Sequence, residues 1–268
     1  MNDFNNNSLD KTLDEKIKKT AELIKDSKSI VALTGAGMST ESGIPDFRSP
    51  GTGIWEKIDP MKFASIDSFI KGLDLDELIN LISDLDITSI FTSEPNEGHK
   101  ALAELETINK LEGIITQNVD MLHQKAGCKN VIEIHGSMKT ASCLRCNKKI
   151  EFDEFLAETI EQQKIPPKCP CGGIIKPDVV FFGEMLPKKA LSRSIEYVSR
   201  CDMLLAIGSS LVVYPVSSLP RLAKEHGAKL VIINIEKTPY DNVADVVIHG
   251  KIGTVLPRVV KEVKRLMK

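Results

Sequence analysis

IVALTGAGMSTESGIPDFRS, residues 30–49, begins as an apolar run and then breaks sharply at a glycine-rich turn. The run from Ile30 to Leu33 has the length and the β-branched content of a buried parallel strand. Gly35 and Gly37 would let backbone N–H groups approach a pyrophosphate, and a helix that opens at residues 38–40 would favour the same negative charge. The stretch therefore predicts a strand that ends in a nucleotide-binding turn.

The glycines alone fit an ordinary tight turn equally well. A complete dinucleotide fingerprint has a third glycine near position 40, where this chain carries Thr40, and an acid about 20 residues further on that closes a second strand. The chain has neither feature. The loop at residues 43–49, however, carries an acid, an aromatic ring and a guanidinium, and Pro45 stiffens it. This loop favours a ligand site, and a surface loop with a mixed charge pair is the alternative.

The composition indicates a globular protein without a strong electrostatic field. Its 268 residues suffice for one large core with a smaller attached lobe. Basic and acidic residues number 35 and 37, and the net charge of −2 argues against direct binding of nucleic acid or membrane. No run approaches the roughly 18 apolar residues of a membrane span, and the first 20 residues are unlike a secretory signal. We therefore expect a cytoplasmic protein.

Apolar runs that alternate with amphipathic segments predict an α/β fold with a doubly wound parallel sheet. A covering helix should run from Ser8 or Asp10 to about Asp26, residues 51–55 should form a loop, and residues 74–91 a helical insertion. The expected strands are 30–33, 113–116, 131–134, 178–183, 203–207, 229–235 and 245–248. The larger domain should comprise residues 1–50, 98–136 and 177–268, and the inserted smaller lobe should comprise residues 51–97 and 137–176.

Polar clusters follow two of the predicted strands at their carboxyl ends. Residues 117–120, with the sequence QNVD, follow one strand, and His135-Gly136 follows the next. Open α/β sheets bind their ligands at this edge, so both clusters should contribute to one site. A core histidine at a strand end is the less favoured interpretation of His135, and His99 is expected to be structural or capping.

The chain has two close cysteine pairs, Cys143-Leu-Arg-Cys146 and Cys169-Pro-Cys171. Four thiolates suit a tetrahedral zinc ion, and in a reducing compartment the six cysteines favour metal binding over disulfides. Such a site has no open coordination position, so the zinc would be structural. A redox dithiol pair is the rival interpretation. Cys128 and Cys201 are expected to be small buried hydrophobic residues.

Taken together in their order, these motifs resemble the sirtuin family, the NAD-dependent protein lysine deacylases. The similar stretches are GAGMSTESGIPDFRS at 35–49, TQNVDMLHQKAG at 116–127, HG at 135–136, the cysteine pairs, KPDVVFFGE at 176–184, GSSLVVYP at 208–215 and NIE at 234–236. The resemblance implies a Rossmann-like NAD-binding domain beside a smaller zinc-ribbon and helical lobe, with the substrate tunnel between them. The residues at 64–92 and the short second cysteine pair depart from the family pattern.

The resemblance also implies a role for each matching residue. The pyrophosphate cradle would comprise Gly35, Ala36, Gly37, Thr40 and Arg48. The ribose and adenine contacts would be Gln117, Gly208, Ser209, Ser210, Asn234, Glu236 and Ile252. The nicotinamide pocket would comprise Ile44, Asp46, Val119 and Asp120, with Phe47 covering the reacting face. Catalysis would fall to His135 and Asn118, and the zinc ligands would be Cys143, Cys146, Cys169 and Cys171. The walls that clamp an acyl-lysine peptide would be Val179, Val180, Phe181, Gly183, Glu184 and Val213.

The implied reaction transfers the acyl group of lysine to ADP-ribose and releases nicotinamide, with His135 as a general base. Residues 51–98 contain no tyrosine or arginine that could hold an acidic acyl chain, so neutral chains should be preferred. The partners would be acetylated proteins or peptides. Two alternatives stay open, namely protein ADP-ribosyl transfer and a non-catalytic, NAD-sensing zinc module.

Overall fold

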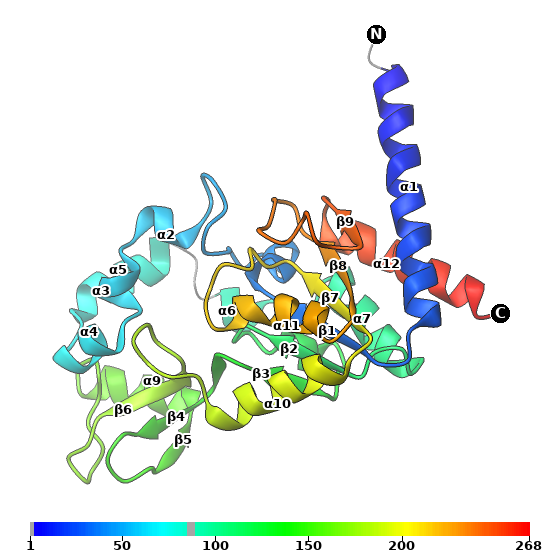
Figure 1. The fold of residues 1–268 in the computed structure, drawn as a ribbon. Helices are drawn as coiled ribbons and strands as arrows, with labels where there is room; N and C mark the ends of the chain where they lie inside the picture. The colour runs from blue at the N-terminus through cyan, green and yellow to red at the C-terminus, as the bar shows by residue number, and fades with distance from the viewer. Residues whose placement is uncertain (1–2, 85–88) are drawn as a thin grey trace.

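Six parallel strands form the sheet of the larger lobe (Figure 1). The computed structural model describes residues 3–84 and 89–268. The strands are β1 (Ile30–Thr34), β2 (Gly113–Thr116), β3 (Val131–Glu133), β7 (Met203–Ile207), β8 (Lys229–Ile233) and β9 (Val246–Ile248). Their spatial order is β3-β2-β1-β7-β8-β9, so the order reverses between β1 and β7, where doubly wound sheets bind ligands. The predicted Rossmann-like sheet is confirmed.

Helices cover both faces of this sheet and explain why its strands are apolar throughout. One face carries α1 (Asp3–Asp26), α7 (Glu97–Thr107) and α12 (Ile252–Leu266), and the other carries α10 (Lys188–Arg200) and α11 (Leu219–Glu225). Successive residues of β1 point to opposite faces, so Ile30 and Ala32 join the first core while Val31 and Leu33 join the second. All four side chains are fully buried, as the apolar run predicts.

The smaller lobe combines an antiparallel sheet with short helices. Its sheet has the order β5-β4-β6, and its strands are β4 (Gly136–Cys143), β5 (Lys149–Glu151) and β6 (Ile175–Val179). The helices are α2 (Ile54–Lys57), α3 (Pro60–Phe63), α4 (Ile66–Lys71), α5 (Leu75–Asp84), α6 (Ser89–Thr92) and α9 (Phe152–Glu161). The segment that carries α2 to α6 is called the helical insertion from here on. Phe91 of α6 stacks on Phe152 of α9 with ring centroids 5.4 Å apart, which joins the helical insertion to the cysteine-containing part.

Three details of the sequence prediction are wrong. Residues 178–183 do not rejoin the parallel sheet, because β4 starts directly after His135 and pairs antiparallel with β6. Residues 38–40 do not open a long helix, because two 3-10 turns end at Gly43, which has a φ of 89°. The expected loop at 51–55 already enters α2 at Ile54. The helical prediction for residues 74–91 is confirmed in α5 and α6, and residues 85–88 lie outside the described residues.

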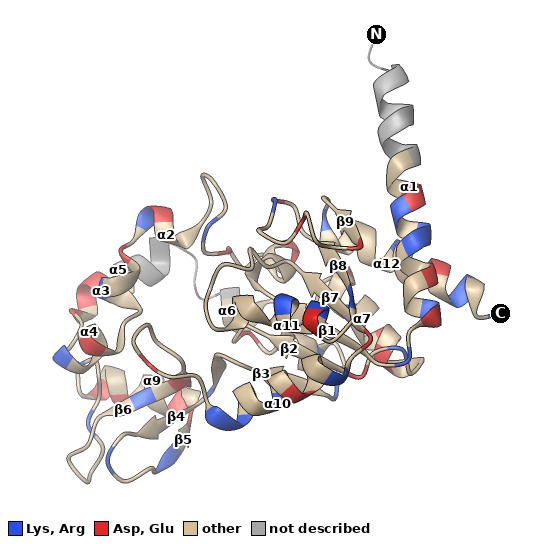
Figure 2. Ribbon diagram, in the orientation of Figure 1, with Lys and Arg blue, Asp and Glu red and all other residues tan. Residues whose placement is uncertain are grey.

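Helix α1 begins at Asp3, earlier than predicted, and the expected cap at Ser8 or Asp10 concerns side chains outside the described residues. The remaining short helical segments are α8 (Leu122–Lys125) and a 3-10 turn at Val216–Ser218. The positions of acidic and basic residues are interspersed along the ribbon in Figure 2, in keeping with the small net charge. Within the described residues, no helix combines the length and the apolar character that a membrane span requires.

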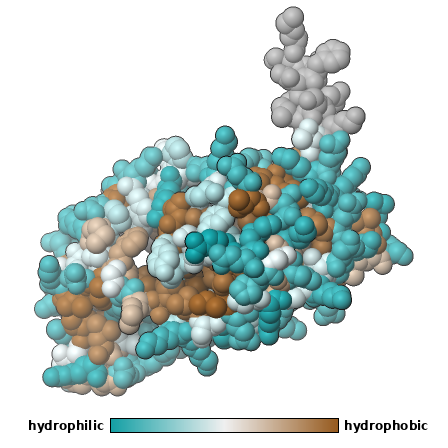
Figure 3. All heavy atoms as spheres, in the orientation of Figure 1, coloured by the Kyte–Doolittle hydropathy of each residue, from teal (hydrophilic) through white to brown (hydrophobic). Residues whose placement is uncertain are grey.

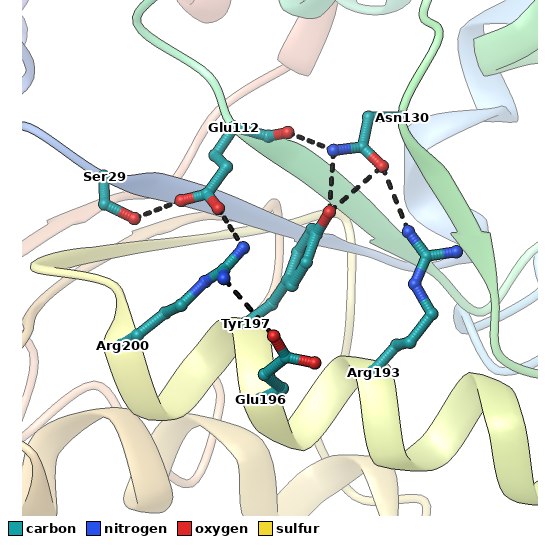
Figure 4. Close-up of polar contacts among 7 residues, drawn as sticks. All are labelled: Ser29, Glu112, Asn130, Arg193, Glu196, Tyr197 and Arg200. Atoms are coloured by element: carbon teal, nitrogen blue, oxygen red, sulfur yellow. Dashed lines mark hydrogen bonds and ion pairs between the residues drawn. The ribbon is translucent and has the colours of Figure 1, made fainter.

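A polar cluster fastens α10 to the amino-terminal edge of the sheet (Figure 4). Asn130 donates from Nδ2 to the Tyr197 hydroxyl over 2.9 Å, and Arg200 of α10 pairs with Glu112, which also accepts a hydrogen bond from Ser29. These contacts join α10 to the residues that precede β1, β2 and β3. Helix α10 starts at Lys188, soon after the predicted substrate wall at residues 179–184, so the cluster anchors the helix that follows that wall.

Candidate functional site

Two glycine turns meet at the switch point of the sheet. The Gly37 N–H donates to the Gly208 carbonyl over 2.9 Å, and the Gly35 N–H donates to the Ile207 carbonyl over 3.2 Å. A Cβ atom on Gly35 would lie 2.8 Å from the Gly208 oxygen, and one on Gly208 would lie 2.3 Å from the Met38 nitrogen. The backbones therefore pack without side chains between them, as the predicted pyrophosphate cradle requires.

A hydrogen-bonded chain joins Asn118 to Asp120 through Ser39. Asn118 Nδ2 donates to Ser39 Oγ over 3.0 Å, and Ser39 Oγ donates to Asp120 Oδ2 over 2.6 Å. The other Asp120 oxygen accepts from the Leu122 N–H over 2.9 Å. Asn118 and Asp120 were predicted to lie at one edge of the sheet, whereas the part played by Ser39 was not predicted. The position of Ser39 could have indicated its role, because the residue follows the glycine turn directly and lies opposite the end of β2.

His135 is held in one tautomer by a backbone carbonyl. Its Nδ1 lies 3.1 Å from the Gln117 oxygen, and because a carbonyl only accepts, Nδ1 carries the proton and Nε2 has a free lone pair. Burial lowers the pKa of His135 below its ordinary value, against the opposing effect of the Gln117 carbonyl. The imidazole is therefore neutral near pH 7 and can accept a proton at Nε2.

The predicted ribose and adenine residues lie at the carboxyl ends of β2, β7 and β8 and at the start of α12. Gln117 Nε2 donates to Ser209 Oγ over 2.8 Å, which joins the ends of β2 and β7. Asn234 Nδ2 donates to the Glu236 carbonyl over 2.8 Å, so this pair shapes the turn after β8. Ile252 is buried as the first residue of α12. The structure thus collects these residues on one edge of the sheet.

The loop at residues 43–49 is organised by Asp46 and leads to a group of aromatic rings. The Asp46 carboxylate accepts hydrogen bonds from the backbone N–H groups of Arg48 and Ser49, at 2.9 and 2.7 Å. Phe47 stacks on Trp55 with centroids 4.9 Å apart, and Trp55 lies 6.0 Å from Phe182. The sequence motif predicted a role for Phe47 but not for Trp55. The rings connect the loop to the helical insertion and to the predicted wall.

The other predicted pocket and cradle residues are distributed over the same turns. Ile44 is buried, Arg48 is exposed, and Thr40 donates from Oγ1 to the Gly37 carbonyl over 3.1 Å. The Val119 carbonyl accepts from the Met138 N–H over 3.4 Å, which places Val119 against β4. Ala36 forms part of the first 3-10 turn, and Ser210 follows the buried Ser209.

The predicted substrate wall is hydrogen-bonded to His135 at one point and to the helical insertion at another. The Val180 N–H donates to the His135 carbonyl over 2.8 Å, and the Phe182 N–H donates to the Ala64 carbonyl over 2.8 Å. Gly183 has a φ of 89° and turns the chain, so the Glu184 carboxylate points back and accepts from the Phe181 N–H over 2.8 Å. Val213 lies on the loop after β7. Figure 3 shows a hollow where the two lobes meet, bordered by apolar surface.

Two buried histidines lie behind the hydrogen-bonded chain of Ser39 and Asp120. His123 Nε2 lies 2.9 Å from Thr34 Oγ1, and the rings of His99 and His123 are 4.9 Å apart. Burial lowers the pKa of His99 to about 4 and that of His123 to about 3, so both are neutral near pH 7. His99 is fully buried within α7, which agrees with a structural role.

The four paired cysteines converge as a metal site requires. All four sulfurs lie within 4.8 Å of one another, with Cys143 3.5 Å from Cys171 and Cys146 3.8 Å from Cys169. A zinc tetrahedron with metal–sulfur distances of about 2.3 Å has edges of about 3.8 Å, so the group fits zinc. The backbone N–H of Cys146 lowers the pKa of the Cys143 thiol to about 6, which favours the thiolate form.

The two unpaired cysteines are buried, as predicted. Burial raises the pKa of the Cys128 thiol to about 12 and that of the Cys201 thiol to about 11. Both sulfurs are therefore protonated at neutral pH and unsuited to act as nucleophiles.

Comparison with known proteins identifies close relatives over nearly the whole chain. A model of the Sir2 family matches residues 35–215. The chain is 47% identical to NAD-dependent protein deacetylase 1 of Pyrobaculum aerophilum, over 97% of this chain and 99% of the relative. A solved Sir2 variant with a deacetylated p53 peptide and 3′-O-acetyl ADP ribose is 39% identical, with a TM-score of 0.84 over 92% of this chain and 98% of that one. Sir2Tm bound to a propionylated peptide is 37% identical, with a TM-score of 0.79 over 92% and 98%.

Replacing Cys143 by alanine should remove the metal and loosen the smaller lobe. Three remaining thiolates bind zinc much less tightly, and a structural zinc contributes folding energy directly. We expect one zinc per chain in the wild type, loss of zinc in Cys143→Ala, and faster amide hydrogen exchange in β4, β5 and β6. Cys201→Ala, which removes a buried thiol of the larger lobe, should retain the metal. Folded wild-type protein without zinc would contradict the assignment.

Replacing Gly208 by alanine should destabilise the switch point. The new Cβ would overlap the Met38 backbone, and the φ of 62° is itself unfavourable for alanine. We expect the free energy of unfolding in urea to fall by at least about 2 kcal/mol. The matched control is Gly227→Ala, which has a φ of 85° but open space around its Cβ, and it should lose only about 1 kcal/mol. Equal losses in the two variants would show that the close approach is unimportant.

Proposed function

The chain belongs to the Sir2 family and is an NAD-dependent protein deacetylase or deacylase, and from this premise we propose that the site between its lobes removes neutral acyl groups from lysine. The acyl group passes to ADP-ribose and nicotinamide is released. The observation that carries the proposal is the state of His135, which is neutral, fixed through Nδ1 and free to accept a proton at Nε2. The residue also adjoins the predicted substrate wall through its own carbonyl.

NAD, when bound, supplies an electrophilic ribose carbon to the amide oxygen of the acyl-lysine. Asn118 positions the reacting ribose, and its orientation is supported by the hydrogen bond to Ser39. His135 accepts a proton from a ribose hydroxyl at Nε2, and the Gln117 carbonyl stabilises the imidazolium that results. Phe47, held against Trp55, restricts water at the reacting face.

The substrate is an acyl-lysine within a protein or peptide. Support comes from the wall at residues 179–184, whose backbone is attached to His135 through Val180 and to Ala64 through Phe182, before it turns at Gly183. An added peptide strand would lie along this wall, with Val213 on the facing loop. One solved relative was bound to a deacetylated p53 peptide and another to a propionylated peptide, and the acetyl and propionyl groups are both neutral.

The proposal also assigns a separate role to each lobe. Residues 1–50, 98–136 and 177–268 form the domain that binds NAD, and residues 51–97 and 137–176 form the zinc-binding and helical lobe. Zinc has a structural role because four sulfurs leave no position for a reacting group. A cytoplasmic location is part of the proposal, since metal-binding thiolates persist in a reducing compartment.

The decisive experiment is mass spectrometry of an acetyl-lysine peptide incubated with the protein, with and without NAD. Deacylation predicts loss of the acetyl group and formation of acetyl ADP-ribose only when NAD is present. Protein ADP-ribosyl transfer predicts instead that label from the adenylate stays on protein. A non-catalytic NAD-sensing module predicts no change in either substrate.

Replacing His135 by alanine should keep the fold and NAD binding but lower deacylation by about 10² or more, because a general base is lost. The matched control is His226→Ala, since His226 makes the same Nδ1 contact to a carbonyl, that of Leu222, at an exposed helix end. That variant should keep wild-type turnover. Near wild-type rates in His135→Ala would refute the assignment.

The acidic limb of the pH profile should lie below the ordinary histidine value of about 6.5. The base acts when neutral, and burial lowers the pKa of His135, so the active form persists to lower pH. We expect the midpoint of the acidic limb to lie below pH 6.5 and kcat/KM to fall tenfold per pH unit well below that midpoint. A fall that is already complete near neutral pH would mean that another group controls the rate.

Acetyl and butyryl peptides should be used with a kcat/KM at least about tenfold higher than a matched succinyl peptide, because a buried carboxylate without a partner costs several kcal/mol. Of the lysines in the helical insertion, Lys62 already pairs with Glu77 and lies over the Phe63 ring. Lys57 and Lys71 are exposed. Equal or better use of the succinyl peptide would show that a cation enters the acyl pocket.

A further inference from the structure

We propose that Lys176 is a positioning residue for deacylation, and that its buried ammonium fixes the backbone that holds the substrate peptide. The residue lies in β6, just before the wall at residues 179–184, and its side chain is only 8% exposed. The inference rests on the proposed function, because that function assigns the wall to the peptide. It adds a residue that touches neither the peptide nor NAD and acts through the wall.

The ammonium uses its full hydrogen-bonding capacity on this one segment. Lys176 Nζ donates to the Pro177 carbonyl over 2.8 Å and to the Val179 carbonyl over 2.7 Å. Its third contact is the Glu184 carboxylate at 3.1 Å. Because an ammonium has three protons, these acceptors satisfy it completely. One side chain thus joins the start of the wall to its end.

Glu184 carries the restraint to the middle of the wall. The same carboxylate oxygen that meets Lys176 accepts from the Phe181 N–H over 2.8 Å. The ammonium also lies 4.6 Å from the centroid of the Phe181 ring, which packs edge-on against Phe69 of the helical insertion. Lys176 and Glu184 together therefore define both the backbone path and the direction of the Phe181 side chain.

Stability alone is a poor explanation for this arrangement. Desolvating an ammonium and a carboxylate opposes the energy gained from their attraction, and an apolar side chain of similar volume often serves a lobe equally well. What the ion pair adds is direction, since three short contacts permit only one course of the chain from Pro177 to Glu184. The neighbouring Lys149 shows the contrast, because it pairs with Asp178 at 3.3 Å but is 64% exposed and contacts none of the wall carbonyls.

The restraint reaches the reacting residues through one hydrogen bond. Val180 follows the residue that Lys176 holds, and its N–H donates to the His135 carbonyl over 2.8 Å. A wall released by loss of Lys176 would present the acyl-lysine less often in line with His135. Binding of NAD depends on the glycine turns of the larger lobe and would be little affected. The effect should therefore fall on the peptide.

The test compares Lys176→Met with Lys149→Met, which removes the same charge from the same cavity of about 720 Å³. We measure kcat, KM for an acetyl-lysine peptide and KM for NAD, and amide hydrogen exchange over residues 177–187. Lys176→Met should raise the peptide KM about tenfold or more, keep the NAD KM within twofold and speed exchange of the Phe181 amide. Lys149→Met should leave all of these within twofold. An unchanged peptide KM and exchange rate in Lys176→Met, or parallel losses in both variants, would overturn the proposal.

Glu184→Gln provides an independent check should Lys176→Met lose zinc or fail to fold. It keeps the volume and removes the ion pair, so the peptide KM should rise less than in Lys176→Met but still more than in Lys149→Met. If the two residues act as a unit, adding Glu184→Gln to Lys176→Met should worsen the peptide KM by less than twofold. Fully multiplicative effects would contradict a shared role. Wild-type protein without NAD-dependent deacetylation would refute the proposed function, whereas the exchange measurement tests the role of Lys176 without any activity.

Discussion

The contact between two glycine turns, without side chains between them, is the constraint on which the site depends. Gly37 donates to the carbonyl of Gly208, and a Cβ on Gly35 or Gly208 would overlap the opposite backbone. Because the strand order reverses between the neighbouring strands β1 and β7, this contact forms where a doubly wound sheet opens to ligands. Ser39 follows directly and is thereby brought against the ends of β2, where Asn118 and Asp120 are. The polar chain is a consequence of the glycine contact.

His135 connects the two lobes because its side chain and its backbone serve different partners. The imidazole bonds to the carbonyl of Gln117 in the larger lobe, while the His135 carbonyl accepts from Val180 in the predicted wall. Gly136 then turns the chain with a φ of 78°, and a Cβ there would lie 2.0 Å from the Asp178 oxygen. The base and the substrate wall therefore cannot move independently. The predicted zinc site can influence the wall only through the connecting chain, since β6 starts a few residues after Cys171 and continues into the wall.

The sequence predicted what depends on local pattern and missed what depends on contacts across the fold. The apolar runs predicted the six parallel strands, and the cysteine spacing predicted the sulfur cluster. Residues 178–183 contain an apolar run with β-branched residues like those of the core strands, so composition could not tell that they leave the parallel sheet. Ser39, Trp55 and Lys176 were missed for a related reason. Each has a partner far away in sequence, namely Asp120 for Ser39, Phe182 for Trp55 and Glu184 for Lys176, and a hydroxyl, a ring or an ammonium on its own has no pattern that reveals such a partner.

The two halves of the site are built from different kinds of contact, and this difference has a consequence for specificity. The half that we propose for NAD relies on backbone contacts between glycine turns, where almost any side chain would clash. The half that we propose for acyl-lysine relies on side chains, among them the Lys176 and Glu184 pair and the stacked rings of Phe47 and Trp55. Side chains can be exchanged without altering the path of the sheet, whereas the glycine contact cannot be changed without moving β1 and β7. Substitutions among these side chains are therefore expected to change which acyl-lysine is used while the proposed cofactor site keeps its geometry.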